Sequence, residues 1–257
     1  MSILIDPPLW PAHGRLWSHL VSDTSLAELH LFARRAGLPE RGFEGDHYDV
    51  PEERYADLVA LGASPVGATE LARTLRDSGL RFPKRKGERP LARVEGGLAA
   101  ATSAPHILDV VASPHERTGA GAAVVLVRTE AEGLMALVRN ATRSGWAPPG
   151  GKRETGESVR EGAVREVGEE TGLLLDPGAL SPVGYERVVV REGGDPRPFA
   201  VGVNLIQVFA AVVPAPVSLR PDLDDVLEAA WFSRGDAEGL AGAQPWWPVV
   251  RWWWERH

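Results

Sequence analysis

The sequence contains no cysteine among its 257 residues. Disulfide bonds, thiol nucleophiles and zinc sites with cysteine ligands are therefore excluded. Long apolar runs are also missing. The longest, residues 119–127, is stopped by Arg128 and is far shorter than the roughly 18 residues that a membrane span needs. We therefore expect a protein without a membrane-spanning segment.

A secretory signal and an excess of basic charge are lacking as well. Asp6 and two prolines interrupt the first ten residues, which have no basic segment. Acidic residues outnumber basic ones by 35 to 28, which gives a net charge of −7. Such a chain is not expected to hold nucleic acid by bulk charge, although it suits divalent cations. These features predict a cytoplasmic protein.

The composition that remains is that of a globular protein. Apolar residues make up 44% of the chain and charged residues 25%, and the length suits one large or two small domains. The texture of the sequence predicts four parts: a small α/β domain at 1–90, a linker at 91–104, a second domain at 105–240 and a tryptophan-rich C-terminal helix at 241–257.

The N-terminal part alternates short apolar runs with helical patterns. Residues 2–5 are typical of a strand. A helix starting near Leu26 could be capped by Asp23 or Ser25 and would end at Gly37. Pro51 opens a second helix, and a third covers about residues 69–80. These elements predict a small α/β unit.

A basic run at residues 81–89 (RFPKRKGER) follows these helices. It could contact nucleic acid, but basic residues beside proline and glycine favour a solvated linker. The next residues, to about Ala104, are rich in alanine, glycine and serine. This shift in composition predicts the domain boundary.

From residue 105 onward the pattern indicates strands. Residues 122–129 and 133–140 predict a hairpin, because a turn-like TEAEG lies around their junction. The cluster WAPPGG then leads into a helical segment. Further strands are expected at 183–191, 199–213 and 229–233.

The helical segment at 151–174 is the most informative part of the chain. Thr155 or Ser158 could cap it, and Gly172 is a suitable C-terminal stop. Two glycines, Gly162 and Gly168, lie inside the helix, and each costs about 1 kcal/mol relative to alanine. A purely structural helix gains nothing from them.

Three carboxylates share one face of this helix. Glu166, Glu169 and Glu170 stand at i, i+3 and i+4, so they repel one another in the half of the helix where its dipole disfavours negative charge. Arg165 is the cation of that half. Because carboxylate oxygens are the ligands that Mg²⁺ and Mn²⁺ prefer, a bound divalent cation would account for the arrangement.

The spacing of these residues resembles the Nudix box. That pattern is glycine, five residues, glutamate, seven residues, then Arg-Glu-aliphatic-any-Glu-Glu-any-Gly-aliphatic. Every specified position is filled, by Gly151, Glu157, Arg165, Glu166, Val167, Glu169, Glu170, Gly172 and Leu173. The resemblance covers about residues 105–240. It implies the Nudix fold, an α/β/α sandwich around a mixed sheet.

The resemblance also implies roles for these positions. Glu166, Glu169 and Glu170, with the carbonyl of Gly150, would bind Mg²⁺ or Mn²⁺ and the diphosphate of the substrate. Arg165, counted with the three glutamates as catalytic, would pair with Glu157 and fix the loop against the helix. Glu166 is our choice of general base for the attacking water. An acid outside the box could also serve; the candidates are Asp222, Asp224, Asp225 and Glu228, whose alternative role is that of a polar loop.

The function predicted in this way is a metal-dependent hydrolase that cleaves a diphosphate bond in a nucleoside diphosphate-X substrate by water attack. The alternatives are a nucleotide sensor on the same fold and a two-activity protein with separate N-terminal chemistry. Substrate sub-motifs of the family are missing, so the particular nucleotide stays open.

The first 47 residues contain four of the seven histidines, interleaved with aspartates. A second metal or phosphate site could be built from Asp6, His13, His19 and either Asp46 or His47. In the alternative, Asp23 caps a helix, His30 lies on its face, and Asp46 and Asp49 shape a turn. This region also resembles a family of small uncharacterised domains found ahead of Nudix domains, which implies no activity.

The C-terminal tail holds five of the nine tryptophans. These rings could stack on a nucleotide base. The preferred interpretation is a helix, with Pro248 in its first turn, that packs across a domain or dimer interface. A homodimer is therefore one expected assembly.

Overall fold

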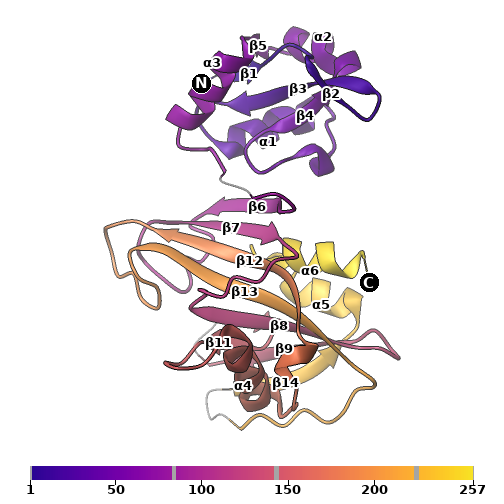
Figure 1. Ribbon diagram of the computed structural model, residues 1–257, viewed down its shortest axis with the longest axis vertical. Helices are drawn as coiled ribbons and strands as arrows, with labels where there is room; N and C mark the ends of the chain where they lie inside the picture. The colour runs from indigo at the N-terminus through magenta and orange to yellow at the C-terminus, as the bar shows by residue number, and fades with distance from the viewer. Residues whose placement is uncertain (1, 83–84, 142–144, 223–225, 257) are drawn as a thin grey trace. The chain divides into compact units, whose positions relative to one another are not determined.

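The computed structural model describes residues 2–82, 85–141, 145–222 and 226–256. The chain divides into two compact units, Met1–Leu91 and Ala92–His257, both built from helices and strands (Figure 1). None of the helices in the described ranges is long and apolar enough to cross a membrane.

The N-terminal unit is built on a five-stranded sheet. Its strands are β1 (Ile3–Ile5), β2 (Trp10–Ala12), β3 (Arg15–Ser22), β4 (Tyr48–Pro51) and β5 (Ser64–Pro65). The long strand β3 pairs antiparallel with β1, β2 and β4, and β1 pairs parallel with β5. This pairing sets β4 directly beside β3, although residues 23–47 separate the two strands in the sequence.

Three helices cover this sheet: α1 (Leu26–Arg35), α2 (Glu52–Ala60) and α3 (Ala68–Asp77), with a 3₁₀ turn at Glu40–Gly42. The hydroxyl of Ser25 caps α1 by accepting a hydrogen bond from the Glu28 N–H, and Gly37 follows its end with φ +67°. Asp23 does not cap the helix. Its carboxylate accepts a hydrogen bond from the backbone N–H of Ser2 at 2.8 Å.

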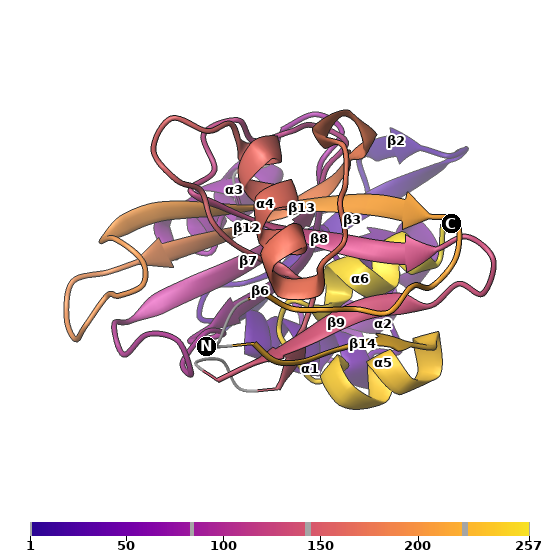
Figure 2. The ribbon, with the colours of Figure 1, turned by 90° about the horizontal axis from the view of Figure 1, so that it is seen from below.

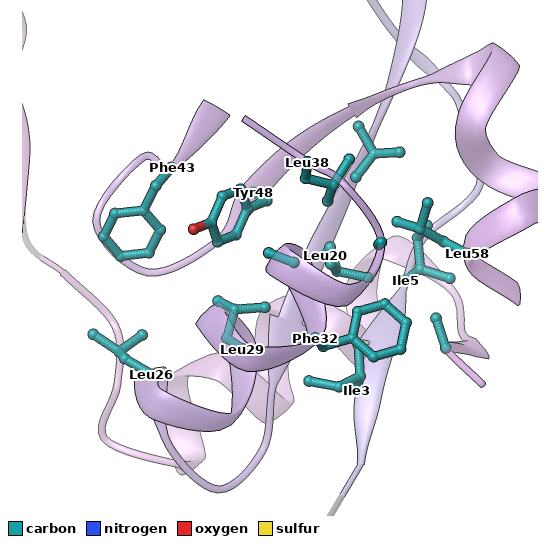
Figure 3. Packing of buried hydrophobic residues seen from close by; sticks show 14 residues of the cluster. Ile3, Ile5, Leu20, Leu26, Leu29, Phe32, Leu38, Phe43, Tyr48 and Leu58 are labelled. Carbon is teal, nitrogen blue, oxygen red and sulfur yellow. The ribbon is translucent and has the colours of Figure 1, made fainter. Parts of the chain in front are cut away.

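The core of the N-terminal unit lies between the sheet and α1. Leu29 and Phe32 of the helix pack with Ile3, Ile5 and Leu20 of the sheet (Figure 3). The alternate strand residues Leu4 and Val21 face the other way, where they pack with Leu71 and Leu75 of α3. The three expected helices and the expected first strand are therefore confirmed, and they form layers on both faces of the sheet.

The C-terminal unit contains a nine-stranded mixed sheet. Its strands are β6 (Arg89–Glu95), β7 (His106–Ala112), β8 (Ala122–Thr129), β9 (Met135–Asn140), β10 (Trp146–Ala147), β11 (Gly150–Lys152), β12 (Ser181–Val190), β13 (Gly202–Val213) and β14 (Val226–Phe232). The main order is β10-β9-β8-β13-β12-β7-β6, with β11 on β8 and β14 on β9. Strands β8 and β13 run parallel, which makes the sheet mixed as predicted.

Helices lie on both faces of this sheet. Helix α4 (Val159–Thr171) lies across β8 and β13 (Figure 2). Its residues Val159, Ala163 and Val167 pack with Val125 and Phe209 of these strands. Helix α6 (Trp247–Trp254) packs against β7 and β12, and α5 (Arg234–Ala241) against β9 and β14. A further 3₁₀ turn covers Pro177–Ala179. The predicted α/β/α sandwich, preceded by a small α/β unit, is confirmed.

The predicted hairpin is formed, but its strands pair at only one position. The partner of Arg128 in β8 is Met135 in β9. Beyond it the strands separate, because β11 pairs with β8 while β10 and β14 pair with β9. This separation admits β11, the strand that leads into α4.

The segment expected to be a linker, 91–104, contains part of strand β6. The division between the two units falls within this strand, after Leu91. Its residue Arg93 forms an ion pair with the buried Asp109 of β7, which in turn pairs with Arg187 of β12, each at 2.9 Å. The strand β6 was not predicted, because its charged residues and its alanine- and glycine-rich surroundings are not typical of a strand. Pairing with the sheet stabilises it.

The tryptophan-rich tail forms the expected helix, and three of its five tryptophans pack within their own unit. Trp247, Trp253 and Trp254 are buried in α6, which packs on the sheet of its own unit. The guanidinium of Arg128 lies 5.8 Å from the ring centre of Trp253. The large apolar rings therefore build the second helical layer of the C-terminal unit.

Candidate active site

The loop and helix that carry the motif have strong local signals. Ser158 caps α4, because its hydroxyl accepts a hydrogen bond from the Glu161 N–H while the Glu161 side chain accepts one from the Ser158 N–H. Of the two possible caps, Ser158 is therefore the one used. At the other end, Gly172 adopts the left-handed conformation with φ +77°. The cap and the glycine set the length of the helix.

Two adjacent glycines let β11 approach the helix and β8 closely. A Cβ atom at Gly150, whose φ is +151°, would lie 2.2 Å from the carbonyl oxygen of Ala123. A Cβ atom at Gly151 would lie 2.4 Å from the carboxyl group of Glu166. Gly150 therefore permits the close pairing of β11 with β8, and Gly151 leaves room for the Glu166 carboxyl group.

Gly162, inside the helix, is explained in the same way. A Cβ atom there would lie 2.9 Å from the Glu157 carboxylate. The loop before the helix thus folds back on the first turns of α4. The glycine lowers the helix propensity, but its missing side chain leaves room for the Glu157 carboxylate. At Gly168 the nearest such atom is 3.7 Å away, so packing does not account for this glycine.

Glu170 is the buried carboxylate of the set. It is 1% exposed, and its Oε2 accepts a hydrogen bond from the backbone N–H of Gly150 at 2.8 Å. This bond joins the last turn of α4 to β11. The Gly150 backbone and the Glu170 side chain, both expected at the site, are therefore in contact.

Arg165 connects the remaining acids. Its Nη2 donates to Glu157 at 3.0 Å and to the carbonyl of Lys152 at 2.9 Å. Its Nη1 donates to Glu166 at 3.1 Å and to Glu169 at 2.8 Å. The hydrogen bonds from Arg165 lower the pKa of Glu157, and those to Glu157 raise the pKa of Arg165. Arg165, Glu166 and Glu169 thus form one charged network with Glu157, whereas Glu170 contacts the Gly150 backbone.

This donor set fits a hard divalent cation. One nitrogen of Arg165 lies between the carboxylates of Glu166 and Glu169, so a positive charge already occupies the place between them. Their oxygens, with those of Glu170 and the Gly150 carbonyl, are ligands of the kind that Mg²⁺ and Mn²⁺ take. The site is partly open, since the Glu169 side chain is 36% exposed.

The candidate acids outside the helix lie in different surroundings. The backbone N–H of Asp222 donates to the Glu169 carbonyl at 2.7 Å, which places this residue beside the last turn of α4. Glu228 forms an ion pair with Arg139 at 3.1 Å on the exposed surface of β14 and β9. Asp224 and Asp225 lie outside the described residues.

A second cluster lies in the N-terminal unit. His19 and His47 approach each other with ring centres 5.0 Å apart, and Asp49 contacts both. Asp6 and Asp46 contact one histidine each. The alternative role expected for Asp49, shaping a turn, overlooked its position in β4 directly opposite His19.

The other two histidines of this region do not join the cluster. His13 lies in the exposed turn between β2 and β3 with φ +51°. His30 lies on α1, as the alternative interpretation expected, and its Nδ1 is 2.8 Å from the Tyr48 hydroxyl. Burial lowers the pKa of His30, which favours its neutral form.

One buried acid escaped the sequence analysis. Glu186 of β12 is 7% exposed, between Val110 of β7 and Ile206 of β13. Burial raises its pKa to about 7. The available signal was a pair of adjacent charged residues, Glu186 and Arg187, in the strand pattern YERVVV, of which one must face each side of the strand.

Two family models match the chain. One, described as the NUDIX domain, matches residues 117–253 and so includes all but the last residue of α6. The other, described as a protein of unknown function (DUF4031), matches residues 3–78. Among curated proteins, the chain is similar to the uncharacterised Nudix hydrolase YvcI of Bacillus subtilis (strain 168), with 49% identity over 39 residues. That match covers 15% of this chain and 25% of the length of YvcI.

Solved structures with similar folds were also found. The pyrophosphohydrolase BsRppH of Bacillus subtilis (E68A mutant) is 21% identical, with 51% of this chain and 75% of that chain covered and a TM-score of 0.39. The NUDIX domain of Shewanella oneidensis NrtR, complexed with ADP ribose, is 15% identical. It covers 55% of this chain and 90% of its own, with a TM-score of 0.42.

Proposed function

We propose that this chain, which belongs to the Nudix family, is a metal-dependent hydrolase that cleaves a diphosphate bond in a nucleoside diphosphate-X substrate. The observation that supports this most directly is the meeting of α4 and β11. There, three glutamates and Arg165 face a glycine pair that lets the backbone approach them.

The metal would be held by Glu166, Glu169, Glu170 and the carbonyl of Gly150. A bound Mg²⁺ or Mn²⁺ supplies charge neutralisation of the phosphate oxygens and lowers the pKa of the attacking water. Without such a cation, three carboxylates on one helix face would repel the diphosphate as well as one another.

The residues of the chain would divide the remaining work. Glu166, next to Gly151, accepts the proton of the attacking water as general base. Arg165 holds Glu157 and orients the two glutamates that it contacts. Glu170 keeps β11 against the helix through its bond with the Gly150 N–H. Asp222, beside the last turn of α4, is the alternative base in the described loop.

The test is product release from a panel of nucleotides with Mg²⁺ or Mn²⁺, by wild type and by Glu170→Gln. The panel contains dNTPs, oxidised dNTPs, ADP-ribose, NADH, nucleotide sugars and dinucleoside polyphosphates. We expect metal-dependent turnover of one class, reduced roughly 10²- to 10⁴-fold in the variant, because a charged ligand is lost.

Glu238→Gln is the matched control, since Glu238 is an exposed helical glutamate on α5. It should leave turnover unchanged. Unchanged turnover in Glu170→Gln would contradict the proposed site. Nucleotide binding without turnover of any panel member would favour a nucleotide sensor over an enzyme.

A further inference from the structure

Two histidines of the N-terminal unit are held by buried carboxylates. The Nδ1 atom of His19 lies 3.0 Å from Oδ2 of Asp6, and Nδ1 of His47 hydrogen-bonds to Oδ1 of Asp46. The two aspartates are only 1% and 3% exposed. Each imidazole is therefore fixed through one ring nitrogen, and its other nitrogen, Nε2, is directed away from that carboxylate.

The two carboxylates are themselves fixed. Asp6 also accepts a hydrogen bond from the Trp10 indole N–H at 3.0 Å. Asp46 accepts one from the backbone N–H of Phe82 at 2.7 Å and lies 3.7 Å from Arg81. Each carboxylate is therefore held by a second donor besides its histidine, so its orientation toward the imidazole is fixed.

The two Nε2 atoms meet at a third carboxylate. Oδ1 of Asp49 lies 3.4 Å from Nε2 of His47 and 4.0 Å from Nε2 of His19. One ligand atom from each of these three residues lies within 4.8 Å of the other two. Strand pairing produces this convergence, because His19 in β3 stands directly opposite Asp49 in β4.

These separations suit a first-row metal ion. Ligand bonds of about 2.1 Å in a tetrahedral arrangement put neighbouring ligand atoms about 3.4 Å apart, so a small closing movement would bring all three into range. Metal-binding histidines almost always donate their second ring N–H to a carboxylate, a backbone carbonyl or a water molecule. The carboxylate form is the arrangement of His19 with Asp6 and of His47 with Asp46.

We propose that His19, His47 and Asp49 bind a divalent first-row cation of the Zn²⁺ or Mn²⁺ class, with Asp6 and Asp46 orienting the two imidazoles. Two imidazoles and one carboxylate favour such an ion over Mg²⁺, which takes oxygen ligands. Three protein ligands leave coordination positions open for water or a ligand oxygen. The side chains are partly accessible, with 26%, 13% and 39% exposed for His19, His47 and Asp49.

This site is independent of the proposed hydrolase function. The α4 site offers only oxygen ligands, whereas the N-terminal cluster offers two nitrogens. The two sites can therefore be told apart by the ligand atoms, whether or not the chain hydrolyses a nucleotide.

The first experiment titrates metal-free full-length protein with Zn²⁺ by calorimetry. All proteins carry Glu166→Gln and Glu169→Gln, which weaken the α4 site. The protein with these two substitutions alone, the parent, should bind one equivalent of Zn²⁺. Adding Asp49→Asn or His47→Gln should weaken that binding at least 100-fold. His13→Asn is the matched control, because this exposed histidine lies in the adjacent turn and asparagine tolerates its positive φ. It should bind as the parent does.

The second experiment compares wild-type protein with one variant, Asp6→Asn. Mn²⁺ bound to wild-type protein should show nitrogen hyperfine coupling in its pulsed EPR spectrum, which the oxygen ligands of α4 cannot produce. Asp6→Asn should weaken Mn²⁺ binding roughly 10- to 100-fold and keep the coupling, because Asp6 positions His19 without binding the metal.

Thermal melts will show whether each variant is folded. If His47→Gln does not fold, the half-exposed Asp49→Asn and the wild-type EPR spectrum still test the proposal. Absence of nitrogen coupling, or Zn²⁺ binding that is unchanged in folded Asp49→Asn, would overturn it. The cluster would then be an ion-pair network that holds β3 against β4.

Discussion

At the scale of single residues, the proposed catalytic site depends on the close approach of Gly151 to the Glu166 carboxyl group. Gly151 has no Cβ, and the Glu166 carboxyl group occupies the space that a Cβ would need. The Glu166 carboxyl group is the end of a flexible side chain, so a methyl group at position 151 displaces this carboxyl group without unfolding strand β11. The glycine therefore bears on catalysis more than on stability.

We predict that Gly151→Ala lowers kcat/KM roughly 10- to 100-fold, because displacing a reacting group by about 1 Å is costly. Its Tm should change little. Gly121→Ala is the matched control, since a Cβ atom at Gly121 meets nothing within 4 Å. Steady-state kinetics and thermal melts check both variants. Equal kinetics for the two alanine variants would show that Glu166 is not held in place by Gly151.

Glu186 contributes to the way in which stability depends on pH. Its carboxyl group receives no hydrogen bond or ion pair from the residues that the structure describes, and burial raises its pKa from 4.5 to about 7. The folded state therefore keeps a proton on this group at pH values where the unfolded state has lost it. By linkage, stability falls as pH rises from about 4.5 to 7, and the loss is complete above the folded pKa.

We predict that Glu186→Gln removes this loss. A pKa raised from 4.5 to about 7 corresponds to about 3 kcal/mol, so the variant should be more stable than wild type by up to that amount at pH 8 and similar at pH 4.5. Urea unfolding at several pH values measures the difference. Glu95→Gln, on an exposed position of β6, should keep the pH dependence of wild type. If Glu186→Gln keeps it too, the buried carboxyl is not its source.

At the scale of elements, α4 brings together charges that would otherwise separate. Glu166, Glu169 and Glu170 crowd the C-terminal half of the helix, so its formation depends on local stabilisers. The capping box of Ser158 and Glu161 and the left-handed Gly172 supply them. The Arg165 network adds attraction to the crowded half.

We predict that Ser158→Ala lowers the free energy of unfolding by about 0.5–2 kcal/mol, because a backbone N–H at the start of α4 loses its acceptor. Thr155→Ala is the control, since Thr155 is an exposed residue of the preceding turn and does not cap the helix. Denaturant unfolding compares the two. A Thr155→Ala loss equal to that of Ser158→Ala would mean that the cap contributes nothing specific.

At the scale of the whole molecule, the division into two units falls within β6. A fragment that begins at residue 100 would lack this strand and with it Arg93, which pairs with the fully buried Asp109. Removing one partner of a buried ion pair typically costs roughly 3–5 kcal/mol. The boundary chosen for a fragment therefore decides whether the sheet is complete.

We predict that a fragment of residues 86–257 retains the kcat/KM of the full chain, whereas residues 100–257 have a clearly lower Tm. Nucleotide hydrolysis and thermal melts of the two fragments test this. A large loss of kcat/KM in the longer, folded fragment would instead show that the N-terminal unit takes part in hydrolysis. Equal Tm values would show that β6 does not support the sheet.

Much of this molecule could be predicted from its sequence. The helix α4, its cap, its glycine stop and the three glutamates on one face follow from spacings of one to seven residues, and such short spacings are fixed by helix geometry. The N-terminal helices were predicted for the same reason. Strand β6 and the sheet face that the tryptophan tail covers could not be predicted, because both depend on partners elsewhere in the chain.

The sequence by itself therefore determined the local features: the loop and helix of the family motif, and the residue types able to hold a cation there. Only the tertiary structure decided which distant residues meet. His19 faces Asp49 because β3 pairs with β4, and Glu186 is buried because β12 lies between β7 and β13. The physical reason is that strand pairing joins segments far apart in the chain, and a side chain's burial depends on what is packed over it.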